Sequence, residues 1–497
     1  MEKLKYWEDK IKQKRKNTPF LKFLLEITSW LPISFYKNNG NISKYHKSDR
    51  INICSIEEYQ NNRDNLLLKG FYYDYTKDFF SNYKKLFLSI NHECLFQAGL
   101  NYNTKYADTA VNVKNVYLSN TVTIGSENVY YSVLVRINSK NIFNSLFVVD
   151  NSEIVYFSKG INKSFKIFYS SFIKNSSDIW FSTNLTGCSN CLFCDNLENV
   201  SYYVNNKKYE KEEYFKTKEI ILRDKSKFLE YYNNLNNNGI NHNSTNVRGN
   251  NIIESDNIEN GYFVFNTKNS KNLMYTGSIT GGENWYDFAF GGEGNLDIYG
   301  VCSSGFGCSK IYLSRSISSS CTNIYYSSNI ESCSYLFGCI GLKNKSYCIF
   351  NKQFEKVEWE NEVCKIFAQM EADGILGDFF PGALNPSYFN DTVAGLLGEF
   401  SREDILNKGY LWREEEIKVD IPEGVEVITT KDLNNYQGFD SNGNWQINPE
   451  ILKKVIKDEK GNYYRIVQME YDFLMKHGLP LPEMHWLDRI KMGFKFK

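Results

Sequence analysis

A short motif repeats along the middle of this chain, and its spacing limits the possible fold more than any other feature. The motif is Asn-apolar-aromatic-x-Ser, and successive copies start 13, 13, 13, 12, 12 and 12 residues apart. A unit of this size is too short for a pair of helices, which needs about 30 residues, but it accommodates a strand and a turn. The copies are NVYLS (115–119), NVYYS (128–132), NIFNS (141–145), IVYFS (154–158), KIFYS (166–170), DIWFS (178–182) and NCLFC (190–194).

The aligned copies form columns of similar residues. The second position is aliphatic in all but the last copy, and the fifth position is serine except for Cys194. Identical residue types on successive strands are typical of a β-solenoid, in which each coil repeats the one below at about 4.8 Å. We therefore predict a mainly β protein. With one strand per repeat, a two-sided coil contains about 25 residues, and a three-sided coil of about 37 is the alternative.

The motif returns later in the chain, which indicates an internal duplication. It reads NLMYT at 272–276, KIYLS at 310–314, NIYYS at 323–327 and YLFGC at 335–339. In addition, LENVSYYVNNKKYEKEEY (197–214) matches LKNKSYCIFNKQFEKVEW (342–359) at a constant offset of 145 residues. We therefore expect two arrays. The helix that follows the second array is expected to cap its open edge, as exposed edge strands require.

The distribution of proline supports this organisation. The chain has 8 prolines, and none of them lies between residues 33 and 380. Proline cannot donate a backbone hydrogen bond, so it is excluded from a continuous ladder. The predicted parts are a helical basic N-terminal region (1–50), a leading α/β segment (51–112), the first array (113–206), a helical and Asn-rich insert (207–258), the second array (259–354), a capping helix (355–376) and a small α+β C-terminal module (377–497).

The N-terminus and the cysteines bear on the compartment. Residues 1–16 are charged and no apolar h-region follows them, which argues against a signal peptide. The apolar run 20–35 is interrupted by charges and Pro32, so we expect a packed helix, with an interfacial membrane helix as the alternative. With no leader, the 12 cysteines are expected to be reduced thiols or metal ligands. These features predict a cytoplasmic protein.

The third position of the motif is aromatic, and it is the candidate binding surface. If these side chains point inward they form a stacked core; if they point outward they form a flat column that could hold sugar rings or bases. Buried stacking is favoured because an exposed aromatic column would be sticky. We refer to these residues as the aromatic column: Tyr117, Tyr130, Phe143, Tyr156, Phe168 and Trp180.

A cluster of cysteines is the candidate metal site. Cys188, Cys191 and Cys194 have the density of a zinc site, since Zn²⁺ favours thiolates at such spacing. The alternative is that cysteine replaces serine as a small buried residue. The period of two along a strand predicts that Cys191 and Cys194 point to opposite faces, which favours this alternative. Zinc is the only cofactor that the sequence suggests.

The sequence predicts no catalytic residue. P-loop, Rossmann and nucleophile-elbow motifs do not occur. A glycan-active β-helix would need clustered carboxylates in a groove, and Asp287 and Asp297 are the only candidates.

Five segments carry a family resemblance: YDYTKDFFSNYKKLF (73–87), VKNVYLSN (113–120), GCIGLKNKSYCIFNKQF (338–354), GDFFPGALNPSYFNDTVA (377–394) and NYYRIVQMEYDFLMKHGLPLPEMH (462–485). In these segments the chain resembles an uncharacterised family of β-solenoid and zinc-ribbon repeat proteins that is abundant in candidate-phyla (CPR) bacteria. The resemblance implies a bacterial repeat protein and no known activity. Family members pair cysteines near both ends, whereas this chain has only Cys54 and Cys94 before the first array and no cysteine in 454–497. Zinc is therefore not expected there.

These observations predict a non-catalytic interaction or scaffold protein with a protein partner, because extended solenoids typically bind along their faces. A nucleic-acid- or ribosome-associated factor is the first alternative, based on the basic N-terminus. The equal numbers of Lys+Arg and Asp+Glu, 58 each, argue against a general nucleic-acid binder. A glycan-binding or glycan-active β-helix is the second alternative. The sequence does not fix an oligomeric state.

Overall fold

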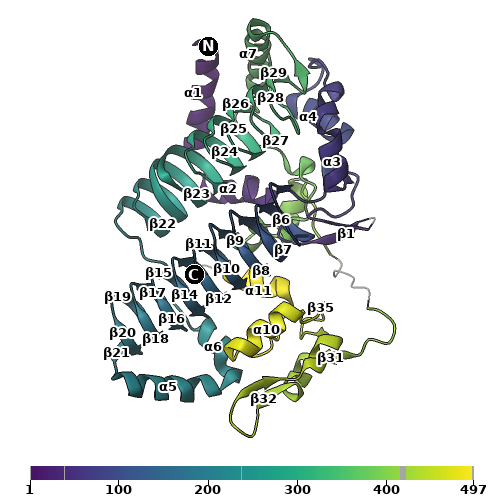
Figure 1. The fold of residues 1–497 in the computed structure, drawn as a ribbon. Coiled ribbons are helices and arrows are strands. Elements are labelled where there is room, and N and C mark those ends of the chain that lie inside the picture. The colour runs from purple at the N-terminus through teal and green to yellow at the C-terminus, as the bar shows by residue number, and fades with distance from the viewer. Residues whose placement is uncertain (1, 39, 237, 415–420, 495–497) are drawn as a thin grey trace. The chain divides into compact units, whose positions relative to one another are not determined.

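The computed structural model describes residues 2–38, 40–236, 238–414 and 421–494. The chain forms two compact units, and each unit is assembled from segments that are separated in the sequence (Figure 1). Unit 1 contains Met1–Phe96 and Ile240–Arg413, and unit 2 contains Gln97–Gly239 and Glu414–Lys497. Both units are mainly β and contain a β-solenoid flanked by helices, which confirms the predicted fold class.

Unit 2 combines the first array with the end of the chain. Its solenoid strands are β5 (Gln97–Ala98), β6 (Tyr106–Val111), β7 (Lys114–Thr123), β8 (Glu127–Tyr130), β9 (Val133–Arg136), β10 (Lys140–Phe143), β11 (Leu146–Val149), β12 (Glu153–Tyr156), β13 (Lys159–Asn162), β14 (Phe165–Phe168), β15 (Ser171–Lys174), β16 (Ser177–Trp180), β17 (Thr183–Thr186), β18 (Ser189–Leu192), β19 (Asp195–Glu198), β20 (Ser201–Val204) and β21 (Lys207–Lys208). Helices α5 (Lys211–Arg223) and α6 (Phe228–Asn233) follow. The C-terminal part contains β31 (Val427–Thr429), β32 (Gln437–Phe439), β33 (Trp445–Ile447), β34 (Val455–Lys457), β35 (Tyr463–Tyr464), α10 (Gln468–His477) and α11 (Trp486–Gly493).

Unit 1 combines the beginning of the chain with the second array. The N-terminal elements are α1 (Glu2–Lys16), α2 (Phe20–Glu26), β1 (Tyr36–Asn38), β2 (Asn41–Ser43), β3 (Asn52–Cys54), α3 (Ile56–Asn62), α4 (Phe79–Ser89) and β4 (Asn91–Glu93). The solenoid strands are β22 (Thr245–Ile253), β23 (Asp256–Gly291), β24 (Leu296–Ser304), β25 (Ser309–Ile317), β26 (Thr322–Tyr325), β27 (Ser328–Ile330), β28 (Ser334–Phe337), β29 (Ser346–Ile349) and β30 (Lys352–Gln353). Helices α7 (Lys356–Ala372), α8 (Val393–Leu397) and α9 (Arg402–Asn407) follow.

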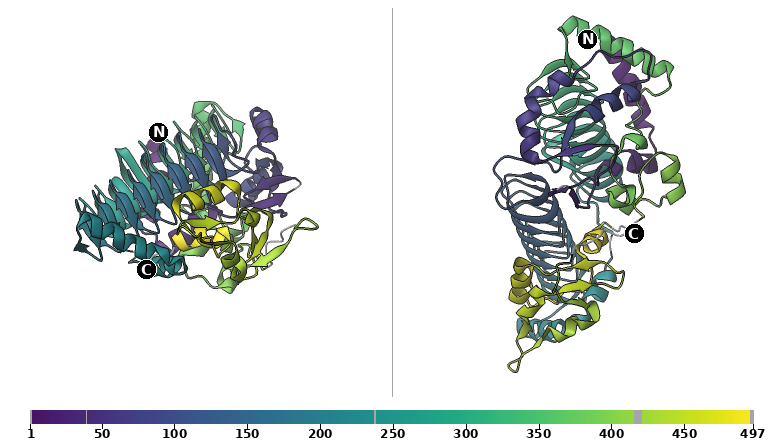
Figure 2. Two further views of the ribbon diagram at one scale, coloured as in Figure 1. Left: turned by 60° about the horizontal axis from the view of Figure 1, so that its bottom comes forward. Right: turned by 90° about the vertical axis from the view of Figure 1, so that its right-hand side faces the viewer.

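The coil is half as long as predicted, because one motif makes one complete turn of the solenoid. Lys140 pairs in parallel with Glu127 on one side and with Glu153 on the other, so each step is 13 residues. Farther along, Phe165 pairs with Ser177, a step of 12 residues. The expected coils of about 25 or 37 residues are therefore wrong. Figure 2 shows the short coils stacked regularly within each unit.

The small coil is possible because the chain turns at every third residue. In the coil that starts at Phe165, left-handed backbone occurs at Lys166 (φ 58°), Tyr169 (φ 49°), Phe172 (φ 58°) and Asn175 (φ 48°). The residue after each of these points into the coil. A proline could not take part, since its φ is fixed near −65° and it has no N–H. The absence of proline from the arrays follows from both constraints.

The interior of the unit 2 solenoid alternates aliphatic and small side chains. In one coil Ile167 and Ile173 are fully buried and alternate with Ser170 and Ser176. Each serine hydroxyl in the column of Ser170 donates to a carbonyl of its own coil and accepts the N–H of the next residue in the column: Ser170 Oγ lies 2.8 Å from Phe168 O and 3.1 Å from Ser182 N. The serine therefore satisfies a backbone donor that the strand ladder does not reach.

Asparagine has a separate role at one half-buried corner of unit 2. Asn115, Asn128 and Asn141 all have left-handed backbone, which asparagine adopts more readily than most residues. Their side chains form a chain of amide hydrogen bonds, from Asn115 to Asn128 at 2.9 Å and from Asn128 to Asn141 at 3.0 Å. The first position of the motif is explained by this corner.

The duplication is visible at the end of each array. In both units the last coil ends in an antiparallel hairpin, β20–β21 or β29–β30, followed by a helix, α5 or α7. Both arrays also begin before the boundaries expected from the motif: β5 and β6 precede residue 113, and β22 lies inside the range 207–258. The motif does not predict these early coils, because their sequences, such as YADTAV in β6, lack it. The range 377–497 divides between the two units at residue 413.

Candidate functional site

The aromatic column of unit 2 lies on the outer face of the solenoid, and the chain itself covers it. The aliphatic column, which includes Val129, fills the coil, so the neighbouring aromatic residue points outward. Phe143 is 1% exposed and its ring stacks on Phe473 of α10 at 4.3 Å. Tyr156 stacks on the same ring at 5.9 Å. In Figure 2 the yellow helices of the C-terminal part lie along the strands of this unit.

The rest of the column is covered in the same way. Phe168 lies 5.7 Å from the ring of His477, and Trp180 lies 6.1 Å from Phe228 of α6. Tyr130 is buried, while Tyr117, near the first coils, is half-buried. The column is therefore neither part of the coil interior nor an open platform for sugars or bases; most of it is covered by α10 and α6.

A second aromatic column, which the sequence analysis did not single out, lies beside the first. It occupies the fourth position of the motif, and four of its members stack on one another along the solenoid: Phe157, Tyr169, Phe181 and Phe193. Tyr131, also at this position, is separated from them by Asn144 and stacks on Trp486 of α11. Phe228, Tyr231 and Tyr232 of α6 pack edge-on against it. The aromatic residues of this position were visible in the repeat, but their burial depends on α6, which the repeat does not encode.

A buried ion pair holds the C-terminal helices together over the column. Arg489 of α11 donates to Glu470 of α10 at 2.5 Å, and both side chains are at most 1% exposed. The guanidinium also lies 4.8 Å from the centre of the Tyr131 ring. Burial alone would lower the pKa of Arg489, but the Glu470 carboxylate raises it above its ordinary value.

Unit 1 has an equivalent aromatic column, covered by a different element. Tyr286, Tyr299, Tyr312 and Tyr325 stack at 5.1–5.4 Å with nearly parallel rings. Helix α1 lies over them. The Tyr325 hydroxyl donates to Glu8 at 2.5 Å, and the Lys12 ammonium lies 5.3 Å from the Tyr299 ring.

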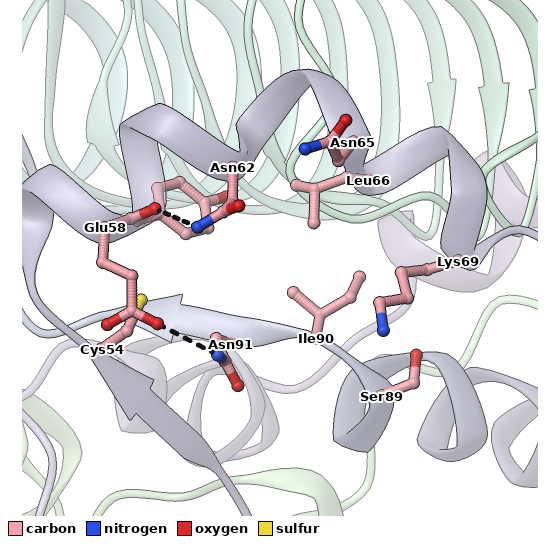
Figure 3. Close-up of a pocket in the computed structure, with 10 residues that line it drawn as sticks. Cys54, Glu58, Asn62, Asn65, Leu66, Lys69, Ser89, Ile90 and Asn91 are labelled. Atoms are coloured by element: carbon pink, nitrogen blue, oxygen red, sulfur yellow. Dashed lines mark hydrogen bonds between the residues drawn. The ribbon is translucent and has the colours of Figure 1, made fainter.

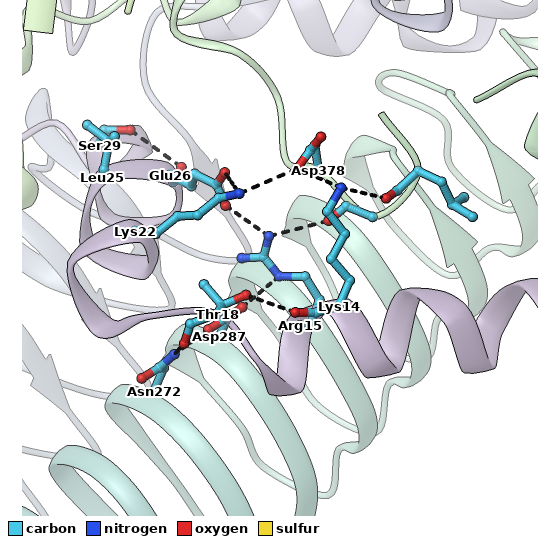
Figure 4. Close-up of polar contacts among 12 residues, drawn as sticks. Lys14, Arg15, Thr18, Lys22, Leu25, Glu26, Ser29, Asn272, Asp287 and Asp378 are labelled. Carbon is cyan, nitrogen blue, oxygen red and sulfur yellow. Dashed lines mark hydrogen bonds and ion pairs between the residues drawn. The ribbon is translucent and has the colours of Figure 1, made fainter. Parts of the chain in front are cut away.

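Four basic residues of α1 form ion pairs within unit 1: Lys10, Lys12, Lys14 and Arg15. Figure 4 shows Arg15 between the carboxylates of Asp287 and Glu26, at 2.6 Å and 2.8 Å. Lys14 pairs with Asp378 at 2.9 Å, and Lys12 lies 3.9 Å from Asp297. Asn272 donates to Asp287 and to the carbonyl of Thr18, at 2.7 Å and 2.9 Å. Much of the positive charge that suggested nucleic-acid binding therefore neutralises acids of the same unit.

The two candidate carboxylates of a glycan-active site, Asp287 and Asp297, differ in their exposure to solvent. Asp287 is 0% exposed and ion-paired with Arg15, and burial raises the pKa of its carboxyl group. Asp297 is about one-third exposed, and its partner is Lys12. Because Asp287 has no access to solvent, it could not act on a substrate in a surface groove.

The three clustered cysteines all point into the unit 2 coil. Cys188 and Cys194 lie in the two serine columns, and each thiol contacts a backbone carbonyl as the serine hydroxyls do. Cys188 Sγ lies 3.4 Å from Thr186 O, and Cys194 Sγ lies 3.4 Å from Leu192 O. Cys191 occupies the aliphatic column. The prediction that Cys191 and Cys194 face opposite sides is wrong, because the left-handed residue in each triplet changes the period from two to three. Across residues 2–38, 40–236, 238–414 and 421–494, no three His, Cys, Asp or Glu side chains are arranged to hold a metal ion.

A hollow of about 260 Å³ in unit 1 is a further candidate for a small ligand. Figure 3 shows Leu66 and Ile90 pointing toward each other across it. The rim is polar, and Asn91 donates to Glu58 at 3.4 Å. Burial raises the pKa of the Cys54 thiol to about 12, so this residue is a neutral thiol and a poor nucleophile. The hollow is lined by Cys54, Glu58, Tyr59, Asn62, Asn65, Leu66, Lys69, Ser89, Ile90 and Asn91.

Comparison with known proteins adds no family or function. No family model matches the chain, and neither curated proteins nor solved structures give a match. The resemblance to the solenoid and zinc-ribbon family therefore stays a prediction. Among the helices in the described part of the chain, none combines the length and the apolar character of a membrane span.

Proposed function

We propose that the protein is a non-catalytic scaffold whose solenoid faces hold partner proteins. The observation that carries this proposal is the burial of the residues that were candidates for ligand binding or catalysis. Asp287, the clustered thiols and all of the aromatic column except the half-buried Tyr117 are buried in structural roles. What the array presents to solvent is a regular, mixed-charge surface.

The exposed face next to the aromatic column of unit 2 illustrates this surface. Lys114, Glu127, Lys140 and Glu153 follow one another on successive coils, beside the asparagine corner. Lys114 and Glu127 form an ion pair at 3.0 Å. A row of alternating charge matches a protein surface better than a phosphate backbone, which requires a surplus of positive charge. The unbridged cysteines are in keeping with a reducing compartment, and we place the scaffold in the cytoplasm.

The test is affinity purification of the full chain after mild crosslinking in native cells, compared with a variant that carries Lys114→Glu and Lys140→Glu. Lys207→Glu, in the β20–β21 hairpin and also exposed, is the matched control. We expect a reproducible set of protein partners that the double variant loses and the control retains. Recovery of no specific partner with the unmodified chain would contradict the proposal.

A further inference from the structure

The two capping helices, α5 and α7, are copies of one element in different surroundings. They start at equivalent positions, and their N-cap residues, Glu210 and Glu355, have the same backbone angles (φ −70°, ψ 151°). At the same offset of 145 residues, Tyr214 and Trp359 are both buried against the last coil. The face that each helix turns toward its solenoid is therefore equivalent.

In unit 1 the next face of the capping helix is covered by α1. Trp7 of α1 stacks on Phe367 of α7, with ring centres 6.0 Å apart and planes 27° apart. One turn farther along α1, Lys10 pairs with Glu371. Helix α1 thus contacts α7 through an aromatic side chain and a lysine three residues later.

In unit 2 the corresponding face of α5 is open. The positions equivalent to Glu360, Cys364 and Phe367 are Phe215, Glu219 and Leu222, which form one stripe because they lie four and three residues apart. Phe215 is 43% exposed, the Glu219 side chain is 68% exposed, and Leu222 is half-buried. Ile220, 72% exposed, adds apolar surface on the solvent side of the same helix.

We propose that this stripe of α5 docks an amphipathic helix of a partner protein, one that presents an aromatic side chain and a lysine one turn away, as α1 does on α7. The apolar residues Phe215 and Leu222 would contact the aromatic side chain, and Glu219 would exchange its exposed pair with Arg223, at 3.0 Å within α5, for the lysine. The inference rests on the proposed scaffold function and names the class of its partner. Helix-in-groove recognition of this kind uses anchors spaced by three or four residues.

The probe is a fluorescent peptide with the sequence of residues 2–17 of this chain, added to the full-length protein and followed by anisotropy. In the full chain the site on α7 is already occupied by α1, so the added peptide reports on α5. We expect saturable binding, at least tenfold weaker in a Phe215→Lys variant. A peptide carrying Trp7→Ala and Lys10→Glu should lose binding to the unmodified protein.

The matched control is Val357→Lys, a substitution at a 72% exposed position of α7, which should leave binding unchanged. Circular dichroism checks that each variant is folded, and both sites are on the surface. Absence of binding at about 1 mM peptide, or equal binding to the Phe215→Lys variant, would overturn the proposal. So would a dimer in solution that Phe215→Lys dissociates, because a second copy would then occupy the stripe. Partners recovered from cells would still support the scaffold function if the peptide failed.

Discussion

Removing one serine hydroxyl from the interior of the unit 2 solenoid tests why this column is serine. Ser170 is 0% exposed and lies in the middle of the array. Its hydroxyl donates to Phe168 O at 2.8 Å and accepts the N–H of Ser182 at 3.1 Å. In a Ser170→Ala variant the carbonyl of Phe168 keeps another donor, the N–H of Phe181 at 3.2 Å, but the N–H of Ser182 is left without an acceptor.

The expected cost follows from that single unsatisfied donor. A buried polar group that loses its partner destabilises the folded state by about 1–3 kcal/mol. The removed hydroxyl leaves little empty volume, so the cavity contribution is small by comparison. We therefore expect Ser170→Ala to lower the free energy of unfolding by about 1–3 kcal/mol.

The chain itself supplies the control. At an equivalent position in unit 1, Cys339 Sγ accepts the N–H of Asn351 at 3.4 Å and lies 3.5 Å from Phe337 O. A Ser170→Cys variant should therefore cost less than Ser170→Ala. Equilibrium unfolding in urea, followed by the fluorescence of nearby Trp180, measures both variants. If Ser170→Ala were as stable as the unmodified protein, or Ser170→Cys more damaging than Ser170→Ala, the role assigned to the hydroxyl would be refuted.

Three further outcomes are expected. Asp287→Ala leaves the buried Arg15 guanidinium with only part of its counter-charge and should cost about 3–5 kcal/mol in urea unfolding; no loss would show that the pair is solvated. Phe473→Ala removes the ring that stacks on the aromatic column and should cost about 3–5 kcal/mol, with faster amide exchange in α10; unchanged exchange would contradict the packing. Burial lowers the pKa of His485 from its ordinary value of 6.5 to about 4. The imidazole therefore binds a proton more tightly in the unfolded chain than in the folded one. The contribution of neutral His485 to the free energy of unfolding is complete above pH 6.5 and is lost as the pH falls toward 4. A His485→Gln variant should show a shallower loss of stability over that range, and an identical pH profile would count against it.

The repeat was sufficient to predict the solenoid and a helix after each array, but not the size of the coil or the number of strands in each repeat, because a repeat such as 127–139 contains two short strands, β8 and β9. The columns of the motif correspond to residues stacked on successive coils, and the helix before Gly478 ends there with a left-handed residue. The coil size depends on left-handed backbone at every third residue. Asparagine indicates such a position, but Lys166, Tyr169 and Phe172 adopt it as well, and these residue types give no local signal.

Which elements cover the outer faces of the solenoids could not be predicted from the repeat either. The motif is compatible with an aromatic column that points into the coil or one that is open to solvent, and neither alternative is correct, because the column points outward and is covered by α10 and α6. That contact joins residues such as Phe143 and Phe473, which are far apart in the sequence and share no motif. For the same reason no motif indicates that Asp287 pairs with Arg15.

The distance between spin labels at Lys114 and Ser201 tests the coil most directly. These residues occupy the same column, seven coils apart in the observed register. With Cys364, the half-buried cysteine, replaced by serine, pulsed electron paramagnetic resonance can measure the separation of labels introduced as cysteines. Seven coil spacings of about 4.8 Å predict a distance of roughly 34 Å. A value near half of that would mean a coil of about 25 residues and would contradict the account of the interior, the aromatic columns and the exposed faces.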